Sequence, residues 1–333
     1  MKSRFSFLVS RLSSKPERET KNEKRETRNE TRTLEILIAT PTNFSFKRTV
    51  MSHGWYDLPP FEFDDQTQTL TRVIDLEGAR PVTVTVKEGK SAVVVATARA
   101  LGQRATERVV RDVRHMLRLD EDMTSFYEAV LRDPEFSWIA ASGAGRMLRG
   151  ATIFEDLVKM ICTTNCSWAL TDKMVNSLVD ALGAPSPGGR RAFPTPESMA
   201  SAPEQFYREV VRAGYRAPYL KELAELVASG SHNVEGWLSS DLPTSELMRE
   251  MKKVKGVGTY AAENMLRLVG RYDGLALDSW VRAKFARTRN GGRKASDKKI
   301  ERYYKRFGNW SGLAFWCDMT RDWLEEEEEQ RKW

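Results

Sequence analysis

The order of hydrophobic and polar positions divides the chain into a short strand-rich part and a long helical part. Within residues 55–97, "RPVTVTVKEG" places Val82, Val84 and Val86 on one face of a strand, and "SAVVVATA" follows after a Gly-Lys turn. From about Gln103 onward, the apolar residues recur at helical spacing instead. The pattern predicts a mostly α protein with a small N-terminal antiparallel β-sheet.

The helical part contains a series of amphipathic segments. Apolar residues recur at helical spacing in "ERVVRDVRHMLRL", "IFEDLVKMICTTN" and "SWALTDKMVNSLVDALG". The last of these ends at Gly183, a residue type that often follows a helix C-terminus. Residues 184–196 are rich in Pro and Gly and predict a loop. Further helices are predicted at about 203–213, 217–229, 244–254, 259–269 and 279–288, with another near the end.

The two ends of the chain lack this periodicity. The first 15 residues contain Arg, Lys and Ser but no acid, which resembles the composition of an organelle transit peptide. The next segment, "PERETKNEKRETRNETRT", has almost no apolar residue and predicts disorder. The alternatives to a transit peptide are that this extension is dispensable, or that translation starts at Met51. We therefore divide the chain into a disordered basic extension, a sheet-plus-helix domain, a helical domain and an acidic tail, at residues 1–50, 51–140, 141–324 and 325–333.

Composition excludes several classes of protein. The 333 residues are 41% hydrophobic and 30% charged, and no run of 18 apolar residues predicts a membrane span. Of the net charge of +7, the first 50 residues supply most, with 12 Lys or Arg against 6 Asp or Glu. Overall charge is thus weak evidence for nucleic-acid binding by the folded part. The cysteines, Cys162, Cys166 and Cys317, predict a reducing, intracellular compartment, and we interpret the first two as small residues of one helix. No metal site or cofactor is predicted.

Residues 254–262, "VKGVGTYAA", place a glycine turn between two predicted helices. Glycines allow a backbone to approach a partner closely, and the N-terminus of the second helix offers free N–H groups to an anion. A P-loop pattern is absent, and a dinucleotide-binding turn would follow a strand rather than a helix. A DNA phosphate is therefore the better ligand, although the same pattern also occurs where two helices simply pack.

Asp278 follows eighteen residues after Tyr260, in "LALDSWVRAKF". An Asp at this position commonly caps the helix that follows it. A half-buried carboxylate beside a DNA-binding turn is also placed to stabilise positive charge or to activate water.

These segments together resemble the helix-hairpin-helix (HhH-GPD) DNA glycosylase superfamily, in its alkylbase and 8-oxoguanine branches. The turn "VKGVGTY" and the later "ALDSW" have the spacing of that family, and "IFEDLVKMICTTNCSWALTDKMVNSLVDALG", "AGYRAPYLKELAE" and "FGNWSGLAFWCDM" resemble its other segments in order. The resemblance covers about residues 52–323. It implies two helical subdomains with the site in the cleft between them, beside an N-terminal sheet.

The resemblance also implies roles for individual residues. Asp278 would stabilise an oxocarbenium-like sugar after one nucleotide has been flipped out of bent duplex DNA. The hairpin would hold a phosphate, and its carbonyls would bind a monovalent cation. The DNA-binding residues implied are Asn165, near the vacated stack, with Lys255, Gly256, Val257, Gly258 and Thr259.

Bifunctional members carry a Lys at the position of Tyr260, where its amine attacks the sugar and allows strand cleavage. Tyr260 cannot form that adduct, so we predict a monofunctional enzyme without AP-lyase activity. No four-cysteine cluster follows Asp278, which disfavours the iron–sulfur branch. Phe315 stands where the 8-oxoguanine branch has a base-reading Gln. The base-pocket residues expected are Tyr260, Trp280, Phe315 and Trp316.

Residues 284–306 carry 10 Lys or Arg and 2 acids, and we expect this stretch, with Arg282 and Lys284, to contact phosphates. A solvated loop and helix face is the alternative. The leading hypothesis is a monomeric, monofunctional base-excision DNA glycosylase that acts on double-stranded DNA containing a damaged base, an alkylated purine above all. The alternatives are an 8-oxoguanine-type glycosylase and a non-catalytic lesion or DNA-structure binding protein. The sequence does not identify the compartment, which we expect only to contain DNA.

Overall fold

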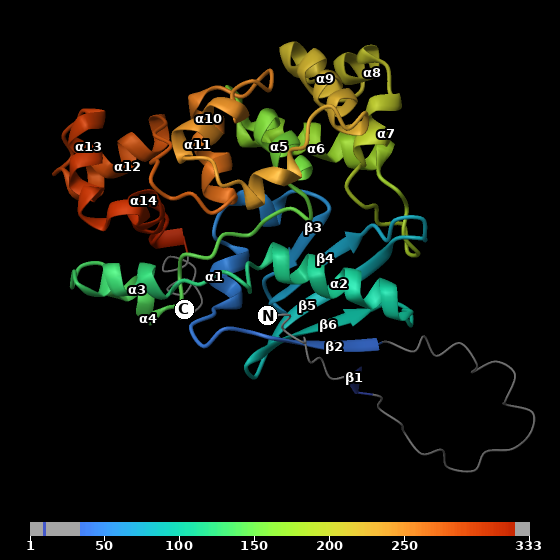
Figure 1. The fold of residues 1–333 in the computed structure, drawn as a ribbon, viewed down its shortest axis with the longest axis horizontal. Coiled ribbons are helices and arrows are strands. Elements are labelled where there is room, and N and C mark those ends of the chain that lie inside the picture. The colour runs from blue at the N-terminus through green and yellow to red at the C-terminus, as the bar shows by residue number, and fades with distance from the viewer. Residues whose placement is uncertain (1–8, 11–33, 324–333) are drawn as a thin grey trace, which may run out of the picture.

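An antiparallel sheet forms the base of the fold, and most helices of the C-terminal half lie above it (Figure 1). The structure, a computed structural model, describes residues 9–10 and 34–323. The strand order is β1-β2-β6-β5-β4-β3. The strands are β1 (Val9–Ser10), β2 (Leu34–Ala39), β3 (Phe61–Asp64), β4 (Thr69–Ile74), β5 (Val82–Gly89) and β6 (Ala92–Thr97). The predicted alternation is confirmed, since Val82, Val84 and Val86 all point into the core.

The extension predicted for residues 1–50 is too long. Strand β2 and helix α1 (Phe46–Val50) lie inside it, and Ile36, Ile38 and Phe46 are buried. β2 pairs with β6 along its whole length. The charged run that precedes β2 dominates the composition of this region and hides one short apolar segment. A chain that starts at Met51 would lose β2 and α1. The predicted transit peptide, apart from β1, and the acidic tail lie outside the described residues.

The predicted succession of helices is confirmed, with small shifts at their ends. Three helices, α2 (Gln103–Met116), α3 (Thr124–Leu131) and α4 (Ser137–Ala141), follow the sheet. The helices that come next are α5 (Ile153–Thr163), α6 (Trp168–Leu182), α7 (Pro196–Ser201), α8 (Glu204–Glu209), α9 (Ala217–Ala228), α10 (Thr244–Met251), α11 (Thr259–Leu268), α12 (Ser279–Arg289), α13 (Asp297–Tyr304) and α14 (Ser311–Met319). Short 3₁₀ helices are η2 (Gly54–Asp57), η3 (Gly214–Arg216), η4 (Glu235–Ser239) and η5 (Lys305–Trp310). Sequence reasoning missed the short helices α3, α4 and α7, and also α13, which lies inside the basic stretch. None of the described helices combines the length and apolar composition needed to cross a membrane.

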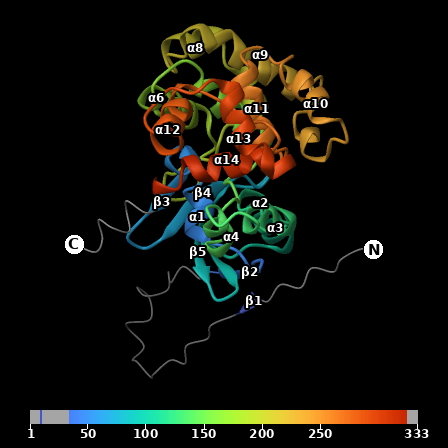
Figure 2. The same ribbon diagram turned by 90° about the vertical axis from the view of Figure 1, so that its left-hand side faces the viewer.

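Two hydrophobic clusters form the core, and they do not follow the boundary predicted at residue 140. The larger cluster joins the sheet to α2, α5, α6 and α9–α11. The smaller cluster packs α3 and α4 against α12–α14, which lie together in Figure 2. The sheet-plus-helix segment therefore contributes to both cores.

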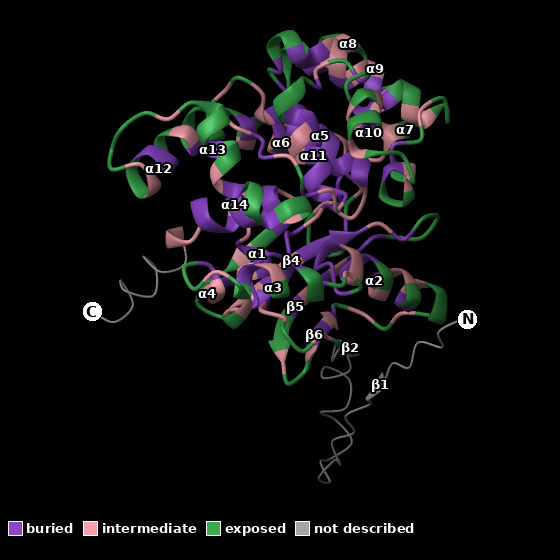
Figure 3. Cartoon of the chain, turned by 60° about the vertical axis from the view of Figure 1, so that its left-hand side comes forward, coloured by how far each residue is buried: buried purple, intermediate pink, exposed green. Residues whose placement is uncertain are grey.

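Helix α5 is the central element of the larger cluster. Every residue from Ile153 to Cys162 is buried, including three charged ones (Figure 3). Glu155 accepts two hydrogen bonds from Arg72 of β4, at 3.0 and 2.5 Å, and one from Lys159 at 2.8 Å. The ring of Phe61 lies 4.5 Å from the Arg72 guanidinium and 4.9 Å from the Lys159 ammonium. This buried charge group links the sheet to the helices.

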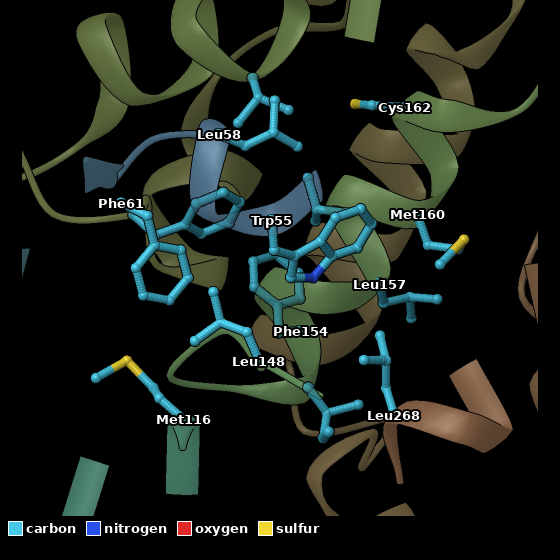
Figure 4. Packing of buried hydrophobic residues seen from close by; sticks show 14 of the residues in the cluster. Trp55, Leu58, Phe61, Met116, Leu148, Phe154, Leu157, Met160, Cys162 and Leu268 are labelled. Carbon is cyan, nitrogen blue, oxygen red and sulfur yellow. The ribbon is translucent and has the colours of Figure 1, made fainter. Parts of the chain in front are cut away.

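Asp156, the next residue on α5, holds the segment that leads into β3. Its Oδ1 atom accepts hydrogen bonds from Trp55 Nε1 and from the backbone N–H of Gly150, both at 2.7 Å. Trp55 lies between Phe61 and Leu157 in the packed interior (Figure 4). Burial, reinforced by the charge of Glu155, raises the pKa of Asp156 from 3.8 to about 7. The Oδ2 atom has no partner among the described residues, so it is the atom free to carry the proton.

We predict that Asp156→Asn makes stability less dependent on pH. The folded state holds a proton on Asp156 between the unfolded pKa of 3.8 and the folded pKa of about 7. The free energy of unfolding therefore falls as pH rises through this window. Asn resembles the protonated acid, so the variant should lack this decline and should exceed the wild type in stability at pH 8. Urea unfolding at pH 4, 6 and 8 measures the effect.

Glu155→Gln is the matched control, because burial effects on this residue are outweighed by its two cations. The guanidinium of Arg72 and the ammonium of Lys159 overcome burial and lower the pKa of Glu155 from 4.5 to about 2. Its contribution to stability is thus present above pH 4.5 and is lost only as pH falls toward 2. The variant should lose about 3–5 kcal/mol at neutral pH. An Asp156→Asn protein less stable than the wild type at pH 8 would contradict the prediction.

Candidate active site

A cavity of about 1140 Å³ opens between the helices above the sheet. Segments far apart in the sequence supply its walls. Those used below are His53–Asp57, Thr163–Cys166, Trp168, Tyr215, Gly256, Gly258–Ala261, Asn264, Ala276–Trp280, Trp316 and Trp323.

The predicted glycine turn joins α10 to α11 beside this cavity. Gly256 has φ of +89°, and a Cβ atom there would lie 2.9 Å from Cδ2 of Tyr219. Both the backbone conformation and the close approach therefore require glycine. Gly258 is the N-cap of α11, and neither a capping side chain nor an acidic first turn occupies the N–H groups of that helix. The turn leaves a helix N-terminus open to an anion.

The other predicted hairpin residues differ in what they expose. Val257 packs its side chain in the core, so only its backbone can meet a ligand. Lys255 is exposed and forms an ion pair with Glu222 at 2.6 Å. Thr259 accepts a hydrogen bond from Lys252 at 3.1 Å through its hydroxyl. Phosphate binding by these residues, and cation binding by the hairpin carbonyls, stay predictions.

Asp278 lies at the N-terminus of α12 and lines the cavity. Its Oδ1 atom accepts a hydrogen bond from the backbone N–H of Val281 at 2.8 Å. The capping role predicted from sequence is therefore confirmed. The bond fixes the rotation of the carboxylate while the residue remains only half-buried.

Tyr260 lines the same cavity from the first turn of α11. Burial first, and then the charge of Asp278 and a side-chain hydrogen bond to it, raise the pKa of Tyr260 to about 12. The phenol is thus neutral at physiological pH and is a hydrogen-bond donor to the carboxylate. The position offers Asp278 a polar neighbour but no amine.

Aromatic side chains form much of one wall. Trp280 and Trp316 line the cavity as predicted, with ring centres 6.3 Å apart, and Trp323 lies 5.7 Å from Trp280. The prediction for Phe315 is wrong. Adjacent residues of a helix point about 100° apart, so Phe315 of α14 turns into the smaller core, where its ring lies 5.0 Å from that of Tyr304.

The predicted basic contacts are only partly available. Lys284 is buried and forms an ion pair with Asp322, so the prediction that it contacts DNA is wrong for the structure as described. Arg282 is half-buried and is paired with Asp297 at 2.8 Å. The exposed residues of the stretch include Arg287, Arg293, Lys294, Lys298 and Lys299.

Asn165 lines the cavity just beyond the end of α5. The helix was expected to include it, but α5 ends at Thr163 and Asn165 has φ of +47°. Its Nδ2 atom donates to the hydroxyl of Tyr215 at 3.4 Å, and Tyr215 is about half exposed. Cys166 consequently lies in the connection to α6 rather than on the same helix as Cys162.

Sequence reasoning missed the wall that comes from residues 53–57. His53 Nε2 donates to the carbonyl of Leu148 at 2.7 Å, and burial lowers the pKa of His53 to about 3. Trp168 Nε1 donates to Asp57 at 3.0 Å, and its ring covers Gly54, where a Cβ atom would lie 2.4 Å from it. No periodicity marks this segment. Only its density of aromatic and polar residues could have singled it out.

Comparison with known proteins agrees with this geometry. The HhH-GPD superfamily, described as base excision DNA repair protein, matches residues 158–309, a stretch that includes the glycine turn and Asp278. Residues 158–309 belong to the HhH-GPD superfamily. This matched segment is thus of the type found in HhH-GPD base excision DNA repair proteins.

Individual relatives agree with the HhH-GPD fold. A DNA-3-methyladenine glycosylase of Bacillus subtilis (strain 168) is 24% identical over 211 residues, which are 61% of this chain and 69% of the relative. The solved 3-methyladenine DNA-glycosylase of Archaeoglobus fulgidus is 21% identical, with a TM-score of 0.68 over 87% of this chain and 98% of its own. A Clostridium acetobutylicum 8-oxoguanine glycosylase/lyase, solved with double-stranded DNA, is also 21% identical, with a TM-score of 0.67 over 88% and 96%. At these identities the solved structures show the fold alone.

The glycine turn provides a test of the HhH-GPD hairpin. We predict that Gly256→Ala weakens binding to duplex DNA and lowers stability by about 1–2 kcal/mol, because L-residues disfavour positive φ. Gly258→Ala is the control, since a Cβ atom there meets nothing within 4 Å, and its loss should be smaller. Thermal unfolding and fluorescence anisotropy with a labelled duplex measure both effects. Equal losses in the two variants would contradict the assignment.

Proposed function

We propose that this chain is a monofunctional DNA glycosylase that removes a damaged base, foremost an alkylated purine, by hydrolysis with Asp278. The observation that supports this most directly is the shared cavity. It brings together the half-buried carboxylate of Asp278, the open N-terminus of α11 and a wall of aromatic side chains.

Asp278 would act on the sugar of the flipped nucleotide. Breaking the bond between base and sugar leaves positive charge on C1′, and a fixed carboxylate stabilises that charge. The hydrogen bonds from Val281 and Tyr260 hold the carboxylate in place. Water then adds to the sugar and gives up a proton.

Contacts with DNA would surround the mouth of the cavity. A phosphate would bind the first N–H groups of α11, and Asn165 with Tyr215 would fill the space left by the flipped nucleotide. Exposed cations of residues 287–299 would meet phosphates farther along the duplex. Trp280 and Trp316 supply ring faces against which a base can stack.

An excision assay with Asp278→Asn tests the proposed chemistry. Asn caps a helix about as well as Asp, so the variant should keep its stability and its DNA affinity. Its single-turnover rate should fall roughly 100-fold or more. The panel should contain alkylated purines, hypoxanthine and 8-oxoguanine opposite cytosine. Release of 8-oxoguanine alone would replace the alkylated-purine proposal, and binding without release of any base would indicate a non-catalytic lesion binder.

The lack of an amine at residue 260 is tested separately. Wild-type protein should leave the abasic strand intact and should form no covalent adduct under borohydride. Tyr260→Lys should form such an adduct, because an amine at this place lies in the same cavity as Asp278 and can attack the sugar carbon. Tyr260→Phe is the matched control and should form none. An adduct with the wild type would disprove the monofunctional proposal.

A further inference from the structure

Arg267 of α11 lies directly behind the aromatic wall of the cavity. Its side chain is only 1% exposed and does not line the cavity, whereas Trp316 does. The guanidinium carbon lies 4.8 Å from the centre of the Trp316 ring. The indole ring therefore separates a positive charge from the space that a base would occupy.

Among the residues that the structure describes, none forms an ion pair with Arg267. The guanidinium donates to the carbonyl of Leu275 at 2.9 Å and to Oδ1 of Asn264 at 3.3 Å, while its Nε atom has no partner among the described residues. Tyr260 and Glu263 act on it only as nearby groups. Burial lowers the pKa of Arg267 to about 10, so it remains charged at neutral pH. A buried cation without a carboxylate is costly.

A positive charge at this position would affect how the base departs in the proposed reaction. When the bond from C1′ to the base nitrogen breaks, its electron pair goes to the base, and C1′ becomes cationic. A base that is neutral in DNA departs with negative charge and takes a proton from water, while a second water adds to C1′ and releases one. A purine alkylated at N3 or N7 is cationic in DNA and departs neutral. A cation behind the base stabilises the anion that a neutral base becomes on departure. The same cation disfavours the binding of a cationic alkylated purine.

We propose that Arg267 is a specificity-determining residue that stabilises negative charge on the departing base. Among alkylated purines and other damaged bases, the site then selects those that are neutral in DNA over purines alkylated at N3 or N7. The inference rests on the proposed glycosylase function. Asp278 and Arg267 then act at opposite ends of the breaking bond, the carboxylate toward the sugar and the guanidinium, through Trp316, toward the base. Arg267 touches neither the sugar nor the base.

The size of the effect follows from the geometry. A base stacked on the free face of Trp316 would lie about 3.5 Å from that ring, and hence about 8 Å from the guanidinium. At an effective dielectric constant near 20, two charges at that distance change a rate by roughly tenfold or more.

The test compares two duplexes that differ only in the lesion. One carries 1,N6-ethenoadenine, which is neutral, or a faster neutral substrate from the panel above, and the other carries 7-methylguanine, which is cationic. Single-turnover rates are divided by the spontaneous loss from each duplex. Wild type should accelerate release of the neutral base more. Arg267→Met should lose roughly tenfold or more on the neutral base and should hold or gain rate on the cationic one.

Two further variants separate charge from packing. Arg267→Lys keeps the charge and should keep the preference for the neutral base even if both rates fall. Arg118→Met removes another buried guanidinium, which lies 5.4 Å from the ring of Tyr272 and outside the cavity lining, and should leave the preference unchanged. If Arg267→Met does not fold, the test uses the preference of the wild type and of Arg267→Lys for the neutral over the cationic lesion.

Several results would overturn the inference while leaving the glycosylase proposal intact. These are greater acceleration of 7-methylguanine release by the wild type, equal losses on both lesions in Arg267→Met, and loss of the preference in Arg267→Lys. Failure to release any base from the whole panel would instead overturn the proposed function itself.

Discussion

The fold depends on one buried carboxylate, that of Glu155. It lies on a helix that has no solvent-facing side over ten residues, and it accepts hydrogen bonds from Arg72 of the sheet and from Lys159 of the next turn of α5. Removing this carboxylate would leave two buried cations without their partner. The sheet can therefore not shift relative to α5 without breaking this group, and the two layers behave as one body.

That rigidity sets the position of the cavity walls. α5 runs from the charge group to Thr163 at the cavity. Asp156, Leu148 and Trp316 hold residues 52–57 through hydrogen bonds to Trp55, His53 and the Ser52 carbonyl. A segment that belongs to the sheet half of the chain thereby becomes a wall of a site whose Asp278 and hairpin belong to the helical half. The cavity exists only where both halves meet.

Features of the site that are determined by neighbouring residues in the sequence could be predicted, and features that are determined by tertiary contacts could not. The glycine turn, Asp278 as a cap and the two lining tryptophans of α12 and α14 depend on short motifs, and the structure places them at one cavity. The prediction for Phe315 failed because it required the rotation of helix α14 about its axis. The prediction for Lys284 failed because its ion-pair partner, Asp322, lies 38 residues away in the sequence. Strand β2 was hidden by the charged run before it. The walls at residues 53–57 and at Trp168 carry no periodic signal at all, because tertiary hydrogen bonds alone bring them to the site.

The Trp316–Ser52 hydrogen bond has an evolutionary consequence. It joins two segments that both lie outside residues 158–309, the part that matches the superfamily. The proposed catalytic carboxylate and the phosphate-binding turn thus lie in one stretch of the chain. Much of the cavity wall that would contact the base lies in two other stretches, one before and one after it. Mutations in the flanking stretches can therefore alter part of the base-contacting wall without touching the proposed carboxylate, whereas Tyr260, Arg267 and Trp280 lie in the same stretch as that carboxylate.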